Sequence, residues 1–195
     1  GGTSQNIELS VNDIEGLAKF AQEKNCFTVV GPEDPLAAGI VDAFIEKGLP
    51  VFGPTQNAAQ LESSKIWAKE FMKRNSIPTA DFQIFDDAQS AKDFVKSYEK
   101  PVVIKADGLA AGKGVIVCQN KDEANDAIDT ILTKKSFGDA GLKITIEERI
   151  DGIEASYIAL CDGKIGIPMA TSQDHKRIFD NDEGPNTGGM GAYSP

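Results

Sequence analysis

Along the first part of the chain, short runs rich in β-branched residues alternate with segments whose apolar residues recur at helical spacing. The runs Cys26–Val30 and Val51–Phe52 are bounded by turn residues, which is typical of buried strands. Apolar residues at helical spacing precede each run: Ile14, Leu17, Ala18 and Ala21, then Leu36, Ile40, Val41, Phe44 and Ile45. Strands that alternate with helices predict a parallel sheet covered by helices.

The pattern changes character after residue 100. Before it, we expect one helix over residues 57–73 with Trp67 in its packing, a strand Gln83–Phe85 and a helix marked by Ala91, Val95 and Tyr98. After it come two strands around a glycine-rich loop, a helix, a third strand and a hairpin, covering 101–105, 115–118, 124–132, 143–148, 154–161 and 164–170. Residues 101–170 therefore predict a compact α+β unit.

The glycine-rich loop between 101 and 118 carries candidate phosphate chemistry. Glycines let backbone N–H groups approach phosphate oxygens, and Lys105 supplies a positive charge at the rim. The loop is not a Walker A motif, because only three residues separate Gly108 from Gly112 and Gly114 stands where a hydroxyl is needed. A mobile hairpin lid over phosphates and a plain surface hairpin both fit this pattern.

Composition narrows the class of protein. The chain has 195 residues, 41% of them hydrophobic, and a formal net charge of −10 with a pI near 4.6. Such acidity argues against general nucleic-acid binding. An acidic protein that binds phosphates must concentrate its positive charge locally, so clusters of Lys and Arg indicate where such a site would lie. No apolar run reaches the roughly 18 residues of a membrane helix and no signal peptide opens the chain. We therefore expect a cytoplasmic protein without a membrane partner.

Cysteine and histidine usage predicts neither zinc nor thiol chemistry. Cys26, Cys118 and Cys161 fall in apolar runs with wide spacing, which favours buried reduced thiols. His175 is the single histidine, so no second histidine could bind a metal with it, and we expect no reactive catalytic cysteine.

Polar motifs at four places could each belong to a ligand site or simply to the solvated surface. A helical Lys65 is usually solvent-facing, and the adjacent acids Glu147 and Glu148 at a strand end are usually solvated. From Thr171 onward, residues 174–177 could clamp a phosphate and residues 186–191 could wrap a small ligand with backbone amides. The alternative for both tail motifs is a polar surface loop.

Several motifs together resemble one family. They are Pro32-Glu33, Phe52-Gly53-Pro54, residues 105–115, Glu147-Glu148, Glu154-Ala155-Ser156, residues 173–177 and residues 184–195. In this combination the chain resembles the phosphoribosylamine–glycine ligases, also called glycinamide ribonucleotide synthetases, which are ATP-grasp enzymes of purine biosynthesis. The resemblance covers essentially the whole chain, and its last two motifs are the most specific.

The resemblance implies an α/β fold of ATP-grasp architecture. It divides the chain into an incomplete Rossmann-like N-terminal domain, a connecting part of the ATP-grasp core, a lid subdomain and the start of the second part of the core. These parts correspond to residues 1–62, 63–100, 101–170 and 171–195.

The implied activity is an ATP-dependent ligation. Glycine is phosphorylated to glycyl phosphate, and the amine of 5-phosphoribosylamine attacks it to give glycinamide ribonucleotide, ADP and phosphate. ATP with Mg²⁺ or Mn²⁺ is the implied cofactor set, and no nucleic acid or obligate protein partner is implied. Such chemistry needs placement and charge neutralisation, so no side chain is assigned as an acid or base.

The family's binding residues carry over by position. Lys65 and Lys105 match lysines that neutralise ATP phosphates, and the lid is matched by Asp107, Gly108, Gly112, Lys113 and Gly114. Glu147, Glu148 and Ile150 match the segment that bonds adenine, and Glu154 matches the carboxylate that holds the ribose. The residues implied for phosphoribosylamine and glycine are Asp174, His175, Lys176, Arg177, Asn186, Thr187, Gly188, Gly189, Met190 and Gly191.

Members of this family have further sequence before the segment that matches Gly1 and after the segment that matches Pro195. We therefore expect a fragment whose metal ligands lie beyond Pro195 and which is inactive alone. Two alternatives remain: a non-catalytic nucleotide-binding module, and another ATP-grasp carboxylate–amine ligase.

Overall fold

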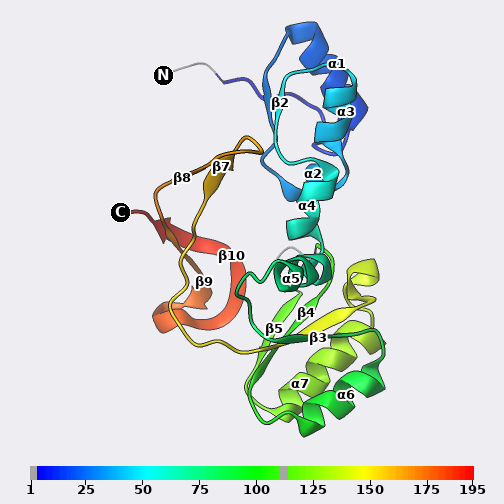
Figure 1. Cartoon of the computed structure of the whole chain (residues 1–195), viewed down its shortest axis with the longest axis vertical. Helices are drawn as coiled ribbons and strands as arrows, with labels where there is room; N and C mark the ends of the chain where they lie inside the picture. The colour runs from blue at the N-terminus through cyan, green and yellow to red at the C-terminus, as the bar shows by residue number, and fades with distance from the viewer. Residues whose placement is uncertain (1–3, 110–113) are drawn as a thin grey trace. The chain divides into compact units, whose positions relative to one another are not determined.

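The computed structural model describes residues 4–109 and 114–195 (Figure 1). The chain forms two compact units, the first comprising Gly1–Thr79 with Asp107–Leu109 and the second Ala80–Ala106 with Ala110–Pro195. Among the described residues, no helix is both long and apolar enough to cross a bilayer.

The first unit contains five helices and two short strands among its described residues. In chain order they are α1 (Ile14–Lys24), β1 (Thr28–Val29), α2 (Glu33–Ala37), α3 (Ile40–Glu46), β2 (Val51–Phe52), α4 (Gln56–Ser63) and α5 (Lys65–Arg74). β1 and β2 pair in parallel, with Thr28 opposite Val51, as the alternation of strands and helices predicts. The buried core lies between α1 and α3 and consists of Ala18, Ala21, Ile40, Val41 and Phe44.

Two predicted helices are wrong in their length, and each is broken at one residue. The stripe from Leu36 to Ile45 forms α2 and α3, because Gly39 adopts a φ of +88°, a conformation that favours glycine. The helix over 57–73 forms α4 and α5, because Ser64 is extended at φ −134° and ψ 112°. Its hydroxyl accepts a hydrogen bond from the N–H of Trp67, so it starts a new helix.

The second unit is built on a four-stranded antiparallel sheet in the order β3-β6-β4-β5. The elements up to its last strand are β3 (Phe82–Phe85), α6 (Ala88–Ser97), β4 (Val102–Ala106), β5 (Val115–Cys118), α7 (Lys121–Ile128), a π-helical turn (Asp129–Thr133), a 3₁₀ turn (Gly138–Gly141) and β6 (Ile144–Glu148). Because β3 pairs with β6, this sheet includes a strand that precedes residue 101.

Helices α6 and α7 cover one face of this sheet (Figure 1). Ile104, Ile144 and Ile146 point toward the helices and are buried, together with Ala91, Val95, Ala124, Ala127, Ile128 and Ile131. The opposite face carries the alternate residues of the same strands, including Lys105, Thr145 and Glu147. The sheet therefore separates an apolar, helix-covered face from a face with polar side chains.

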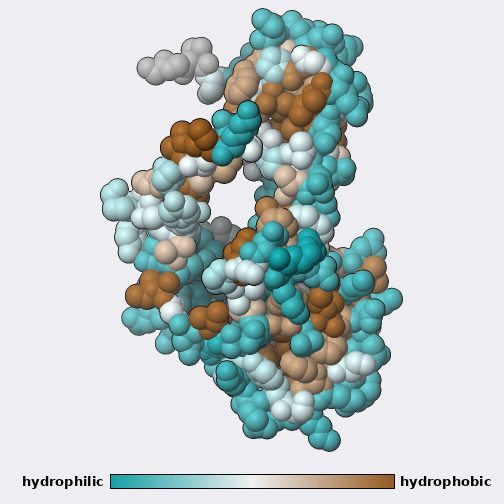
Figure 2. All heavy atoms as spheres, viewed as in Figure 1, coloured by the Kyte–Doolittle hydropathy of each residue, from teal (hydrophilic) through white to brown (hydrophobic). Residues whose placement is uncertain are grey.

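Two antiparallel hairpins follow the sheet. They consist of β7 (Ala159–Cys161) with β8 (Gly166–Pro168), and β9 (Gln173–Phe179) with β10 (Glu183–Tyr193), the latter joined by a 3₁₀ turn (Asp180–Asp182). The first hairpin confirms the predicted pairing of these two segments, but residues 162–165 separate its strands, where only Asp162-Gly163 was expected. Hydrogen bonds from the N–H groups of Ile165 and Lys164 hold the pKa of Asp162 below its usual value. Apolar side chains are exposed along this hairpin (Figure 2), among them Leu160, Ile167 and Met169.

The expectation of three buried cysteines in strands holds for only one of them. Cys118 ends β5 and is buried, whereas Cys161 ends β7 and is exposed, and Cys26 is half-buried outside the strands. The expectation is wrong at Cys161 because both strands of its hairpin are exposed along their length.

We predict that Cys161 reacts with iodoacetamide at pH 8 long before Cys118 does. Burial, with a smaller contribution from Glu123, raises the pKa of Cys118 from 9.0 to about 11. The two-unit shift lowers its thiolate fraction about a hundredfold. Peptide mapping by mass spectrometry measures both rates, and unfolding in urea should make them converge. Equal rates in the native protein would contradict this assignment.

Candidate functional site

Lys65 is the first residue of α5, and its side chain returns to the glycine loop. Its Nζ donates a hydrogen bond to the carbonyl of Gly108 at 3.0 Å. A solvent-facing lysine is the usual outcome for a helical surface, but this one is half-buried and directed at the loop. The structure therefore brings together Lys65 and the first glycine of the loop.

Asp107 lies directly against the N-terminus of α5. Its Oδ1 accepts hydrogen bonds from the hydroxyl of Ser64 and from the N–H of Ile66, both at 2.9 Å. Its backbone carbonyl accepts the N–H of Lys65 at 3.1 Å. The start of the glycine loop is thus fixed to the helix that carries Lys65.

Lys105 and Glu147 form an ion pair on the polar face of the sheet. Lys105 Nζ lies 3.0 Å from Glu147 Oε2, and the Glu147 side chain is only 3% exposed. Thr145, directly opposite Lys105 in the ladder, donates its hydroxyl to Glu147 Oε1 at 3.0 Å. Solvation at the strand end, the alternative for Glu147, is therefore excluded by its burial.

Backbone hydrogen bonds hold the two residues after Glu147 against neighbouring segments. The N–H of Glu148 donates to the carbonyl of Asp81 at 2.9 Å, and that of Arg149 donates to Pro101 at 3.2 Å. Ile150 is 68% exposed at the point where the chain leaves the sheet. Glu148, unlike Glu147, is only half-buried.

The glycine loop is described at both of its ends. Gly108 accepts the Lys65 hydrogen bond at one end, and at the other the carbonyl of the buried Gly114 accepts the N–H of Ala106 at 2.8 Å. Gly112 and Lys113, which the resemblance includes in the lid, lie outside the described residues.

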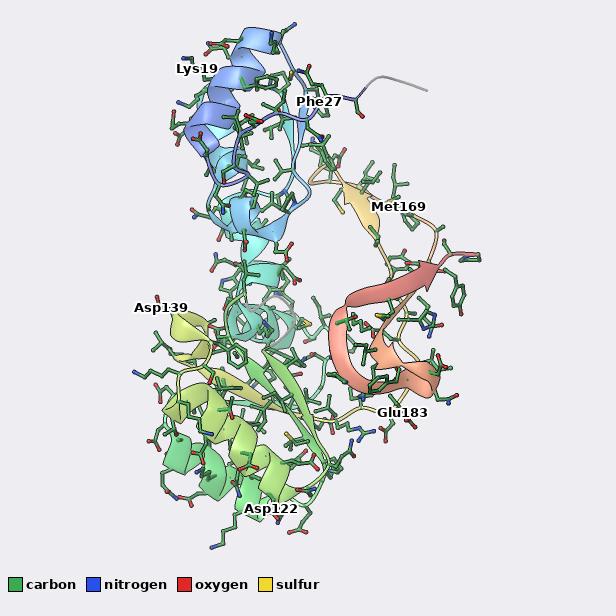
Figure 3. The ribbon with its side chains drawn as sticks, turned by 180° about the vertical axis from the view of Figure 1, so that it is seen from behind. Lys19, Phe27, Asp122, Asp139, Met169 and Glu183 are labelled. Atoms are coloured by element: carbon green, nitrogen blue, oxygen red, sulfur yellow. The ribbon has the colours of Figure 1, made fainter. Side chains whose placement is uncertain are left out.

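The hairpin β9–β10 brings the two tail motifs together. Asn186 lies opposite Arg177, and Gly191 lies opposite His175. Glu183 begins β10 at the turn end of the hairpin (Figure 3). The first motif therefore lies in a paired strand, whereas the second is paired at its two ends, Asn186 and Gly191, and most of its residues are exposed.

A charged cluster links this hairpin to Glu154. Lys176 forms an ion pair with Glu154 and lies 3.9 Å from Asp174 Oδ2. The residue expected to hold a ribose and two residues expected to bind the other substrates are thus neighbours within the second unit.

Within the glycine run of β10, Gly189 lies close to β9, whereas Gly188 and Gly191 face open space. Gly189 has a φ of +124°, and a Cβ there would lie 3.2 Å from Asp174 Oδ1. The hydroxyl of Thr187 accepts the N–H of Gly189 at 3.0 Å and donates to the carbonyl of Lys176 at 2.9 Å. His175 stacks on Tyr193 with ring centroids 5.9 Å apart. Met190 is 58% exposed.

Arg177 and Asn186 line a cavity of about 380 Å³ beside β5. Its lining combines an apolar strand edge with a guanidinium and two amides, and comprises Val115, Ile116, Val117, Gln119, Arg177, Gly184, Pro185 and Asn186. Arg177 also donates to the carbonyl of Gly184 at 3.1 Å, which fixes its position at this wall.

Sequence reasoning missed two contributors to these arrangements. Ser64 was hidden inside a helix predicted to be continuous, although serine before a helical stripe is a known start signal. Gln119 gave no signal, because a turn glutamine after a strand is common on protein surfaces. Within residues 4–109 and 114–195, no group of three or more His, Cys, Asp or Glu side chains could hold a metal ion.

We predict that Lys105 and Glu147 are energetically coupled. The variants Lys105→Met, Glu147→Gln and the double variant should give a coupling free energy above about 1.5 kcal/mol, because a buried carboxylate depends on its cation. Urea denaturation measures the free energy of unfolding.

The pair Lys121–Glu99 is the control for this experiment. It spans 3.6 Å in the same unit, but its side chains are 47% and 87% exposed. Its coupling should stay below about 0.5 kcal/mol, since water screens exposed pairs. Equal coupling in the two pairs would show that the burial of Glu147 has no energetic consequence.

Comparison with known proteins gives the same family for both parts of the chain. The family model described as the phosphoribosylglycinamide synthetase N domain matches residues 1–62, and that described as its ATP-grasp (A) domain matches residues 63–195. The phosphoribosylamine–glycine ligase of Vibrio vulnificus is 56% identical over 192 residues, covering 98% of this chain and 45% of the relative. That of Ralstonia nicotianae is 58% identical over 199 residues, covering 100% of this chain and 47% of the relative. The chain thus spans about half the length of these curated relatives.

Solved structures support the same assignment. The crystal structure of phosphoribosylamine–glycine ligase from Thermotoga maritima has a TM-score of 0.70 at 36% identity, covering 84% of this chain and 40% of that one. Biotin carboxylase from Campylobacter jejuni, solved as a complex with β,γ-ATP, has a TM-score of 0.68 at 20% identity. The match covers 85% of this chain and 39% of the carboxylase chain. The second likeness shows the shared fold alone. The fold is therefore the α/β ATP-grasp architecture, and the chain belongs to the phosphoribosylglycinamide synthetase family.

Proposed function

We propose that this chain carries the nucleotide-handling part of a ligase that joins glycine to 5-phosphoribosylamine. The carrying observation is the identity of 56–58% to phosphoribosylamine–glycine ligases over essentially the whole chain. The reaction is the phosphorylation of glycine by ATP to glycyl phosphate, followed by attack of the phosphoribosylamine nitrogen. The carbon–nitrogen bond forms as phosphate leaves, and the amine loses one proton.

The arrangement of positive charge supports this proposal. In a chain of net charge −10, Lys65 and Lys105 are each held in place, one by the carbonyl of Gly108 and the other by Glu147. Cations held in fixed positions suit phosphoryl transfer, which depends on placement and charge neutralisation. Lys65 and Lys105 would therefore contact ATP phosphates, and the segment Glu147–Ile150 would contact the adenine.

The second unit offers groups for the remaining substrates. Arg177 beside a cavity of about 380 Å³ is suited to the phosphate of phosphoribosylamine, because guanidinium binds phosphate through paired hydrogen bonds. The glycine run Gly188–Gly191 leaves space for a small ligand near backbone amides. Mg²⁺ would neutralise the ATP phosphates when bound, but no cluster among the described residues fits it, so no step is assigned to a metal ligand of this chain.

The test is ADP formation by the full-length protein with MgATP, glycine and 5-phosphoribosylamine. ADP release should require both glycine and phosphoribosylamine, and the product should be glycinamide ribonucleotide by mass spectrometry. ADP release that requires bicarbonate, or a D-amino acid, and not glycine would contradict the proposal. Binding of ATP without any turnover under complete conditions would indicate a non-catalytic module.

We predict that Lys105→Ala lowers kcat/KM for ATP by about a hundredfold, because a fixed phosphate-facing cation is lost. Lys100→Ala is the matched control, since Lys100 is 72% exposed and also lies near a glutamate, 3.7 Å from Glu148. Its kcat/KM should stay within about twofold of the wild-type value. Equal effects of the two substitutions would remove Lys105 from the phosphate site.

A further inference from the structure

The first four N–H groups at the start of α5 all have acceptors, although a helix leaves such groups without helical partners. The N–H of Ser64 completes the last turn of α4, and that of Trp67 is bonded to the Ser64 hydroxyl at 3.1 Å. The other two, from Lys65 and Ile66, both donate to Asp107, to its backbone carbonyl and its carboxylate respectively. A residue more than 40 positions later therefore completes the cap of this helix.

This cap has a consequence for an incoming phosphate. The N-terminus of a helix attracts anions through its free N–H groups and its dipole. At α5 the carboxylate of Asp107 already occupies that position and accepts two hydrogen bonds on Oδ1. The group that α5 can direct to a phosphate is then the ammonium of Lys65, held beside the carbonyl of Gly108.

We propose that Asp107 is a positioning residue, which fixes Lys65 and the start of the glycine loop in one arrangement and is not itself a ligand of the nucleotide. This inference rests on the proposed function, because the phosphate contact of Lys65 belongs to it. The resemblance placed Asp107 among the nucleotide-binding residues of the lid. Its hydrogen bonds give it a different role, through α5 and Lys65.

The structural part of the proposal can be tested on this chain alone. Trp67 is the single tryptophan of the sequence, and its backbone N–H belongs to the same cap. The fluorescence of its indole ring therefore reports on the start of α5. Asp107→Ala should raise acrylamide quenching of Trp67 and speed amide exchange at Ile66 by about tenfold or more, since the acceptor is lost. Asp107→Asn should retain most of the protection, because its amide oxygen can accept the same two bonds.

Asp87→Ala is the matched control. Asp87 caps α6 by accepting the N–H and the hydroxyl of Ser90, at 2.7 and 2.8 Å. Its loss should expose the start of α6 and leave exchange at Ile66 unchanged. Unchanged exchange at Ile66 in Asp107→Ala would overturn the structural part of the proposal.

The functional part is tested by kinetics of the full-length protein. Asp107→Ala should raise KM for ATP roughly tenfold, because small displacements of a positioned group have large effects, and leave KM for glycine within about twofold. Asp107→Asn should largely restore KM for ATP, and Asp87→Ala should not change it.

The double variant Lys65→Ala with Asp107→Ala separates positioning from direct binding. If Asp107 acts through Lys65, the double variant should be no worse for ATP than Lys65→Ala alone. Multiplicative effects of the two substitutions would overturn the inference, because they would show an independent contact with the nucleotide. A wild-type protein that forms no ADP with glycine and phosphoribosylamine would instead overturn the proposed function, while amide exchange would still decide the structural role of Asp107.

Discussion

The burial of the Glu147 carboxylate constrains the whole sheet of the second unit. A charged group that is almost removed from water needs a cation and hydrogen bonds close by, and Lys105 and Thr145 supply both. A slip of β6 by one residue would turn Thr145 and Glu147 into the apolar layer beneath α6 and α7. The register of β6 between β3 and β4 is therefore specified by a polar requirement on one face and an apolar one on the other.

The first unit shows the same rule applied to backbone groups. Helix α5 begins directly after α4, and Ser64 and Asp107 supply acceptors for N–H groups that the helix itself leaves unpaired. The two lysines of the predicted phosphate site thus differ in how they are held. Lys105 is held by a buried carboxylate, whereas Lys65 is held by a carbonyl and by the anchoring of its own helix.

Much of the fold could be predicted from local patterns. The parallel pair β1–β2, the sheet strands around the glycine loop and the pairing of β7 with β8 all follow from periodicity and turn chemistry. The breaks at Gly39 and Ser64 were missed, because apolar spacing continues across both and hides a change of backbone direction.

The family motifs propose residues for the candidate site, but they do not predict the contacts of those residues. The family motifs named Lys65, Lys105, Asp107 and Glu147, yet nothing in their sequence spacing indicates that Asp107 bonds to Ile66 or that Glu147 is buried. Both facts depend on segments separated by about forty residues, which periodicity over one element cannot join. The exposure of Cys161 was missed for a similar reason, since an apolar run does not tell whether its strand has a covering layer.

The ladder between β9 and β10 changes register twice. Between the pairs Asn186–Arg177 and Gly191–His175, β10 advances five residues while β9 advances two, so three residues of β10 have no counterpart. The pairs on either side of this segment hold the two ends of the hairpin together. A substitution at Gly188 or Met190 would therefore remove no ladder pair, whereas Gly189, with its φ of +124°, favours glycine, so ligand preference could evolve at the first two positions separately from strand pairing.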